Sequence, residues 1–457
     1  MDTMKSFLKE VLGGLAVDYA DIRVEETEGS GVIYRGRSLD DVRRSFERGG
    51  CFRIFHRGNW GVATFNNIDE NLKGLAKEVA SEIELLPPRN ETLVALGPFE
   101  DTVRIRPEDD PRRISLTEKR SLLRHYNDII LGNKGIATTV SVYQDSYKHV
   151  VFYSTDDRSL DQETVYTGFA CRAVARDGNN IQDYSDSFGK TQGFDSLKHR
   201  EPMCERIAKV AIDLLKAEPV PAGKYTVVID PLLAGVFAHE AFGHLSEADH
   251  IADNERLKEM MKTGTRFGVD ELTIVDDATM PNERGSYRYD DEGAASERTE
   301  LVRHGILVGH LHNRQTAQQM NELPTGNSRA ISYRFPPIVR MSNTFIESRS
   351  TRLHDMMDSL ESGLYVVGSR GGMTELESFT FSSQYAYLVE HGRKTRMVRN
   401  VTLSGNVFET LKNIEAIGDD LTIFGGIGGC GKGGQAPLPV GLGAPHVKIR
   451  NVLIGGK

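Results

Sequence analysis

The segment His239-Glu240-Ala-Phe-Gly-His244 constrains the fold more than any other feature of the chain. It follows Asp230-Pro231, which is a good helix start because aspartate caps free amide groups and proline is tolerated at the first helical position. The apolar residues from Leu232 to Phe237 predict a buried helix face. Burying His239 and Glu240 on the same helix costs roughly several kcal/mol unless partners satisfy their polar atoms. A bound metal ion would satisfy them.

The spacing of the two histidines is unusual for a helical metal site. They are five residues apart, whereas histidines that share a metal ion on a regular helix are four apart. On an ideal helix the longer spacing separates the two side chains by about 140°. A π-bulge, which absorbs one extra residue, would bring them together, and so would a break of the helix at Gly243. The alternative is a pair of core histidines held by hydrogen bonds alone.

A catalytic zinc site needs three protein ligands and one open position, so a third ligand must be found. The candidates are Glu247, His250 and Cys430. His250 echoes a longer metalloprotease pattern but lacks the glycine that turns the chain there. Cys430 lies between glycines, where the backbone can approach closely, and a thiolate is a good zinc ligand. We favour Cys430.

The glycine-rich segment around Cys430 also resembles a nucleotide-binding loop, because it contains Gly426-x-Gly428-x-x-Gly431 after an apolar strand. Two features disfavour that function. Gly433 follows Lys432 where a magnesium-binding serine or threonine is needed. The proline-containing segment Gln435–Pro439 does not favour the helix whose amino terminus would bind phosphate.

A second group of carboxylates is Asp290-Asp291-Glu292, followed by Gly293. An exposed turn is the favoured interpretation of this pattern. The alternative is a group that binds the amine of a peptide or a second ion.

The order of helical and strand patterns predicts an α+β protein. Residues 1–220 form an amino-terminal domain of the α/β type, with helices and antiparallel strands. Pro219-Val-Pro221-Ala-Gly223 marks the boundary, and residues 221–457 form a β-rich domain that carries the metal site. In the first domain we expect helices at 71–86, 116–131 and 203–217, and strands at 21–26, 50–56, 140–143, 148–154 and 165–175.

Composition narrows the function classes. The formal net charge is −9 and no basic face is evident, which disfavours nucleic acid binding. The four cysteines are widely spaced, as in proteins of a reducing compartment. No apolar run approaches the length of about 18 residues that a membrane helix needs. We therefore expect a cytoplasmic protein that does not bind membranes.

The combination of motifs resembles the TldD branch of the TldD/PmbA metallopeptidase family over nearly the whole chain, with weaker similarity from Gly14 onward. The matching stretches are His239–Asp249, Tyr289–Gly293, Pro324–Asn327, Arg340–Thr344 and Cys430–Gln435. Residues 328–332 do not align. The resemblance implies a two-domain α+β fold and a metal held by His239, His244 and Cys430. It also implies a dimer, formed with a second copy or with a PmbA-type subunit.

The hypothesis for function is zinc-dependent hydrolysis of peptides or unfolded polypeptide segments. Glu240, next to a ligand, would act as the general base. We predict further substrate contacts from Asp290, Asp291, Glu292 and Asn327. The alternatives are a zinc amidase acting on modified peptides and a non-catalytic regulatory or peptide-binding subunit, in keeping with the family's older label as a modulator of DNA gyrase.

Overall fold

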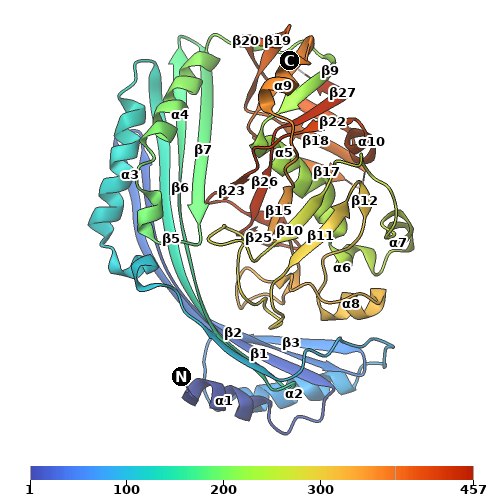
Figure 1. The fold of residues 1–457 in the computed structure, drawn as a ribbon. Coiled ribbons are helices and arrows are strands. Elements are labelled where there is room, and N and C mark those ends of the chain that lie inside the picture. The colour runs from blue at the N-terminus through green and yellow to red at the C-terminus, as the bar shows by residue number, and fades with distance from the viewer. Residues whose placement is uncertain (1, 376, 456–457) are drawn as a thin grey trace.

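The computed structural model describes residues 2–375 and 377–455 of the chain (Figure 1). In this part of the chain, the amino-terminal half is built on one seven-stranded sheet of order β3-β2-β1-β5-β6-β4, with β7 pairing with β6. Its strands are long, and the sheet curves along its length (Figure 1). They are β1 (Tyr19–Arg35), β2 (Ser38–His56), β3 (Asn59–Phe65), β4 (Phe99–Val103), β5 (Ile136–Ser154), β6 (Arg158–Asp177) and β7 (Asn180–Lys190).

Strand β5 corrects one sequence prediction. The segments 140–143 and 148–154 belong to one continuous strand rather than two. Two buried inward positions hold polar residues: Ser141 lies within the first segment, and Asp145 lies between the two. Ser141 donates to Asn127, and Asp145 pairs with the buried Lys119 at 2.6 Å. Because these inward residues are polar, the alternation of apolar and polar residues is interrupted although the strand is not.

Helices cover the two ends of this sheet (Figure 1). Helices α1 (Asp2–Leu12) and α2 (Leu72–Glu84) bury a cluster that includes Leu8, Phe52 and Ile83. Helices α3 (Leu116–Leu131) and α4 (Glu201–Leu214) bury a second cluster at the other end of the sheet. The three helices expected from the sequence are present, and α4 ends at Leu214 rather than residue 217.

The carboxy-terminal half is rich in strands. Within the described residues, a ten-stranded sheet has the order β17-β18-β21-β27-β9-β16-β19-β20-β8, with β22 pairing with β27, and a six-stranded sheet has the order β12-β11-β10-β15-β26-β23. Most neighbouring strands are antiparallel, so the α+β prediction is confirmed. Strands β8 and β9 flank Val220, and the division of the chain at residue 220 stays a prediction.

The strands of the larger sheet are β8 (Glu218–Pro219), β9 (Gly223–Ile229), β16 (Ser362–Val367), β17 (Gly371–Glu375), β18 (Ser378–Ser382), β19 (Tyr385–Glu390), β20 (Arg393–Arg399), β21 (Thr402–Asn406), β22 (Ile414–Ile417) and β27 (Val447–Gly455). Those of the smaller sheet are β10 (Ile274–Asp277), β11 (Arg298–Arg303), β12 (Ile306–Leu307), β15 (Asn343–Ile346), β23 (Thr422–Phe424) and β26 (Gly441–Ala444). Two short pairs are β13 (Ser328–Arg329) with β14 (Ile338–Val339), and β24 (Cys430–Lys432) with β25 (Gln435–Leu438). The helices are α5 (Pro231–Ala238), α6 (Ala248–Ile251), α7 (Glu255–Met260), α8 (Arg314–Met320), α9 (Leu353–Asp358) and α10 (Val407–Lys412).

The structure bears on two expectations drawn from composition, those for the cysteines and for membrane helices. All four cysteines fall within the described residues, and all are free and buried. Among the helices of residues 2–375 and 377–455, none has both the length and the apolar character needed to cross a lipid bilayer.

Candidate metal centre

The two histidines lie where helix α5 changes its winding. Asp230 caps the helix by accepting a hydrogen bond from the Leu233 amide at 2.9 Å, as its sequence predicts. The chain then continues from His239 to Gly243 as a π-helical turn. This turn accommodates the extra residue, so the two imidazole rings approach to 5.3 Å between centroids. Of the two local structures considered, the π-bulge is therefore confirmed and the break at Gly243 is wrong.

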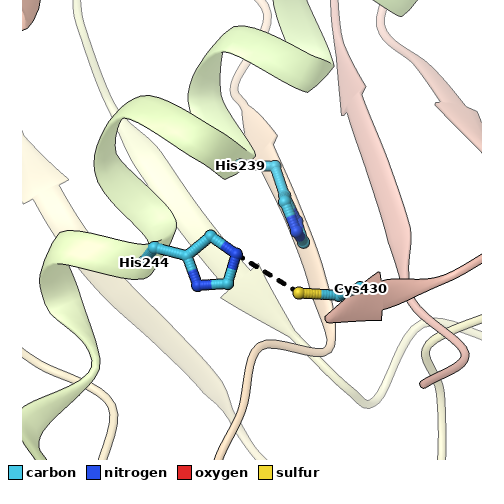
Figure 2. Close-up of side chains that lie close together, drawn as sticks. All are labelled: His239, His244 and Cys430. Carbon is cyan, nitrogen blue, oxygen red and sulfur yellow. Dashed lines mark hydrogen bonds between the residues drawn. The ribbon is translucent and has the colours of Figure 1, made fainter. Parts of the chain in front are cut away.

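The third donor comes from a distant part of the chain. Cys430 begins strand β24, and its sulfur lies 3.3 Å from Nε2 of His244 (Figure 2). The donor atoms of His239, His244 and Cys430 all lie within 4.8 Å of one another. His239 and Cys430 are buried, whereas the side chain of His244 is 24% exposed. The structure thus brings together the three residues that the sequence predicts as ligands.

The electrostatics of this cluster suit a transition metal. Burial raises the pKa of the Cys430 thiol, but hydrogen bonds to His239 and His244 outweigh burial and bring it to about 5. Burial lowers the pKa of His244, but its bonds to Cys430 and Glu247 bring it to about 10. Nδ1 of His239 is buried and has no hydrogen-bond partner within the described chain. A thiolate beside two imidazoles is a donor set that Zn²⁺ prefers, so these residues fit a zinc ion.

Glu247 lies behind His244 rather than among the donors. Its Oε2 is 2.8 Å from Nδ1 of His244, and its side chain is fully buried. Lys432 approaches it at 3.2 Å and also pairs with Asp249 at 2.6 Å. A carboxylate in this position fixes the orientation and tautomer of a metal-binding imidazole. The sequence identified Glu247 only as a possible ligand, and its orienting role was missed.

His250, the other alternative ligand, lies outside the cluster. Its side chain is 52% exposed, and its Nε2 is 3.9 Å from Glu247. The preference for Cys430 over His250 therefore agrees with the geometry.

Glu240 borders a cavity beside the donors. Its Oε2 is 3.9 Å from Nε2 of His244, and its side chain is 30% exposed. The cavity measures about 360 Å³ and is lined by His239, Glu240 and Cys430, by glycines 425, 426, 428 and 429 and by residues 185–187 of β7. Both halves of the molecule therefore contribute to the space in front of the donors.

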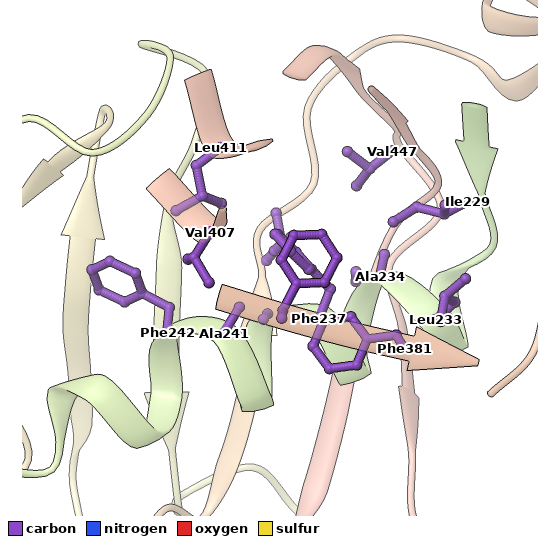
Figure 3. Close-up of a cluster of buried hydrophobic side chains, with 14 of the residues drawn as sticks. Ile229, Leu233, Ala234, Phe237, Ala241, Phe242, Phe381, Val407, Leu411 and Val447 are labelled. Carbon is purple, nitrogen blue, oxygen red and sulfur yellow. The ribbon is translucent and has the colours of Figure 1, made fainter. Parts of the chain in front are cut away.

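Tight packing fixes the helix that carries the histidines. Phe237 packs edge-on against Phe379 and Phe381, and Ala234, Ala241 and Phe242 are buried in the same core (Figure 3). Two glycines permit close approach on the other side. A Cβ at Gly235 would lie 2.7 Å from the backbone nitrogen of Gly443, and a Cβ at Gly243 would overlap the sulfur of Met341. The position of the π-helical turn is therefore set by packing on several sides.

The carboxylate cluster at residues 290–292 is a turn, but the expectation that it is exposed is wrong. Asp290 and Glu292 are 7% and 2% exposed. Asp290 accepts hydrogen bonds from backbone amides, including that of Ser328 at 2.9 Å. The other two acids pair with arginines of the amino-terminal sheet, Asp291 with Arg23 at 2.8 Å and Glu292 with Arg53 at 2.9 Å. Ion pairs across the two halves therefore explain how these charges are buried.

The substrate contacts predicted for this region stay predictions. Asp290 and Asp291 line a second cavity of about 250 Å³, which shares Gly428 with the cavity in front of the donors. Asn327 is 2% exposed and donates hydrogen bonds to Asp276 and to the Arg340 carbonyl. Of the four predicted residues, Asp290 and Asp291 thus have the most direct access to this space.

The glycine-rich segment forms a hairpin rather than a phosphate-binding loop. Lys432 ends β24, and after two glycines with positive φ the chain returns as β25. The helix that a nucleotide-binding loop requires is replaced here by a strand. The hairpin instead presents Cys430 to the histidines.

Two histidines at a π-helical turn and a cysteine of β24, beside a cavity to which both halves of the chain contribute, define a candidate metal centre of an accessible class. Models of the PmbA/TldA metallopeptidases match three parts of the chain: domain 1 at residues 20–85, the central domain at residues 109–216 and the C-terminal domain at residues 222–456. The chain therefore belongs to the PmbA/TldD metallopeptidase family, as its motifs predict.

Relatives of similar length carry related names. A metalloprotease of Synechocystis is 41% identical over 99% of this chain and 98% of its own. A protein of Saccharolobus solfataricus, named zinc metalloprotease TldD homolog, is 29% identical over 97% of each chain. The names of the family and of these relatives indicate a metalloprotease.

Solved structures share the fold at low sequence identity. A Thermotoga maritima protein has a TM-score of 0.81 and 19% identity, covering 99% of this chain and 100% of its own. TldE from Thermococcus kodakarensis has a TM-score of 0.78 and 17% identity, covering all of both chains. These similarities support the fold prediction and carry no argument about activity.

Proposed function

We propose that the protein is a zinc-dependent peptidase in which His239, His244 and Cys430 hold the ion. The observation that carries this proposal is the approach of their three donor atoms to within 4.8 Å at the wall of an open cavity. Membership of a metallopeptidase family and the zinc in the name of the Saccharolobus relative support it.

Each residue of the centre has a distinct part in this proposal. Bound Zn²⁺ supplies a Lewis acid that polarises a carbonyl group and acidifies water near neutral pH. Glu240, at the cavity wall next to a ligand, accepts a proton from the attacking water and delivers it to the leaving amine. Glu247 holds Nδ1 of His244, so that Nε2 faces the ion.

Replacement of Glu240 tests this assignment. We expect Glu240→Gln to lower kcat by at least about 100-fold, because the amide cannot accept a proton, while zinc content stays at the wild-type level. The measurement is mass-spectrometric profiling of cleavage in a mixture of peptides and an unfolded protein, together with metal analysis.

Glu259→Gln is the matched control, because Glu259 is an exposed glutamate of α7 and lies outside the cavity lining. It should cleave as the wild type does. Turnover that survives in Glu240→Gln would refute the role of general base. Zinc binding without cleavage of any substrate by the wild type would favour the non-catalytic subunit, and cleavage only of modified amide bonds would favour the amidase.

We further propose that the substrate is an extended peptide or an unfolded segment. The cavity lies between residues 185–187 of β7, at the edge of its sheet, and glycines 425, 426, 428 and 429. At this edge the Gln384 side chain bonds to the Ser185 backbone as a neighbouring strand would. Backbone at a strand edge can bind an extended chain through main-chain hydrogen bonds with little dependence on its side chains. Sharp dependence of cleavage on one substrate side chain, in the same profiling experiment, would contradict this binding mode.

A dimer belongs to the proposal as well, with either a second copy or a PmbA/TldE-type subunit as partner. Structural similarity to TldE supports such a pairing. Light scattering of the purified chain, alone and mixed with a co-purifying subunit, distinguishes the two. The cytoplasmic location expected from the sequence remains a prediction, as does the absence of nucleic acid and membrane partners.

A further inference from the structure

A second group of metal-type donors lies apart from the centre described above. It consists of His310, His312 and Glu322, whose ligand atoms lie within 4.8 Å of one another. The two histidines flank Leu311 in the loop before α8. Glu322 follows Asn321, the left-handed residue that ends α8 with a φ of 55°. Helix α8 thus returns the chain so that one carboxylate meets both imidazoles.

The contacts within this group are short and buried. Oε1 of Glu322 is 3.0 Å from Nδ1 of His310, and Oε2 is 3.1 Å from Nε2 of His312. The two histidines are 2% and 0% exposed, while the carboxylate side chain is 28% exposed. Polar rings buried this deeply need a partner for each nitrogen.

The proton positions leave one contact without a donor. Nε2 of His310 lies 2.8 Å from the carbonyl oxygen of Met261, which can only accept, so this nitrogen carries the proton. A neutral His310 therefore directs the lone pair of Nδ1 toward a carboxylate oxygen of Glu322. Two acceptors at 3.0 Å require a positive charge between them, either an added proton or a metal ion.

The contact of His312 on the side away from Glu322 favours a metal ion over an added proton. Nδ1 of His312 lies 3.1 Å from the hydroxyl of Thr316, which accepts its proton when the hydroxyl itself donates to the Asn313 carbonyl at 3.4 Å. Each ring then donates one N–H to an oxygen behind it and directs the other nitrogen at the carboxylate. Metal-binding histidines are oriented by this kind of outer hydrogen bond. In this tautomer of His312, one added proton would satisfy His310 alone, whereas one ion would satisfy both rings.

We propose that His310, His312 and Glu322 bind one divalent first-row transition-metal ion. Two imidazoles and a carboxylate suit Zn²⁺ and its neighbours, and these three side chains leave coordination positions for water. Access is available from outside, because His310 and Glu322 border a surface groove of about 710 Å³.

This second ion would stabilise the segment 246–248, which follows His244 of the first centre. The Leu311 amide donates to the Ser246 carbonyl at 2.8 Å, and its carbonyl accepts from the Ala248 amide at 2.9 Å. Glu247, which orients His244, lies between these two residues. Holding His310 and His312 in place therefore also holds the backbone on both sides of Glu247.

Metal counting on the full-length protein tests the proposal. The proteins are wild type, Cys430→Ser, Glu322→Gln and the double variant, each equilibrated with buffered Zn²⁺, desalted and analysed for metal. We expect about two equivalents in the wild type, about one in each single variant and almost none in the double variant. Glu322→Gln should fold, because its amide group can donate to Nδ1 of His310.

Co²⁺ replacement identifies which ion is lost. Only the cysteine-containing centre should give a thiolate charge-transfer band, so Glu322→Gln should keep this band and Cys430→Ser should lose it while retaining visible Co²⁺ absorption. Glu297→Gln is the control, because Glu297 borders the same groove and lies outside the donor group. About one equivalent in wild type and in Glu322→Gln, with none in Cys430→Ser, would overturn the second site and leave the first intact.

Discussion

At the scale of single residues, we expect Glu247 to influence zinc affinity although it lies outside the proposed ligand set. Its carboxylate holds His244 and is held in turn by Lys432. We expect Glu247→Gln to weaken zinc affinity by about 10–100-fold, because the amide is a weaker acceptor for the ligand's N–H group. Competition with a chromophoric chelator measures the change.

Asp249→Asn separates this effect from the loss of a charge near Lys432. Asp249 pairs with Lys432 but lies outside the hydrogen bonds of His244. It should leave zinc affinity close to that of the wild type. Equal losses in the two variants would show that the local charge matters and the orientation of His244 does not.

The three proposed ligand residues could be selected from the sequence because metal chemistry restricts donors to a few residue types. The sequence predicts His239 and His244 from their pattern on a helix, and Cys430 from its residue type and the glycines around it. Glu247 was harder, since the same carboxylate can ligate or orient, and only its distance from Nδ1 of His244 decides between these roles. The donors around Glu322 carry no sequence signal, because the return of the chain after α8 creates their proximity.

At the scale of elements, the π-helical turn depends on the lack of a side chain at Gly243. A Cβ there would overlap the buried sulfur of Met341, which is fully enclosed. We expect Gly243→Ala to lower the free energy of unfolding by about 1–3 kcal/mol through overpacking. Denaturant titration measures this change.

Gly74→Ala is the matched control, because the same substitution should here stabilise the protein. Gly74 lies in α2, is exposed, and has open space around the position of a Cβ. Alanine should stabilise this helix by about 0.5–1 kcal/mol. Stabilisation of both variants would show that Met341 can move aside and that the turn does not need a glycine.

Helices and strands could be predicted from the sequence where their buried residues are apolar. Helices α2 and α3 place apolar residues on one face, so periodicity located them. Strand β5 was divided in the prediction because its buried positions include Ser141 and Asp145, whose partners come from distant residues. The π-helical turn was one of two alternatives, and core packing selected it.

At the scale of the whole molecule, buried ion pairs join the two halves. Arg53 of β2 is 6% exposed and pairs with Asp21 in its own sheet and with Glu292 in the carboxy-terminal half. We expect Arg53→Ala to destabilise the protein by about 3–5 kcal/mol, because two carboxylates lose their buried partner. Trp60 is the only tryptophan in the sequence, and its fluorescence reports unfolding of the amino-terminal sheet.

Arg334→Ala is the matched control across the same interface. Arg334 pairs with Glu47, but both side chains are 49% exposed. Its loss should cost at most about 1 kcal/mol. If the two variants were equally stable, the buried pairs would not be what holds the halves together.

The curvature of the amino-terminal sheet, which helices cover at both ends, could not be predicted from the sequence. It depends on pairing between strands that are far apart in the chain. One such pairing has a consequence for how the protein is made. Strand β27 (Val447–Gly455) lies between β21 and β9, and β9 leads directly into the helix that carries His239. Translation must therefore reach β27 before β9 and β21 can be joined in this sheet. We therefore expect a nascent chain that stops before Val447 to lack a central strand of this sheet and to hold the proposed metal centre incompletely.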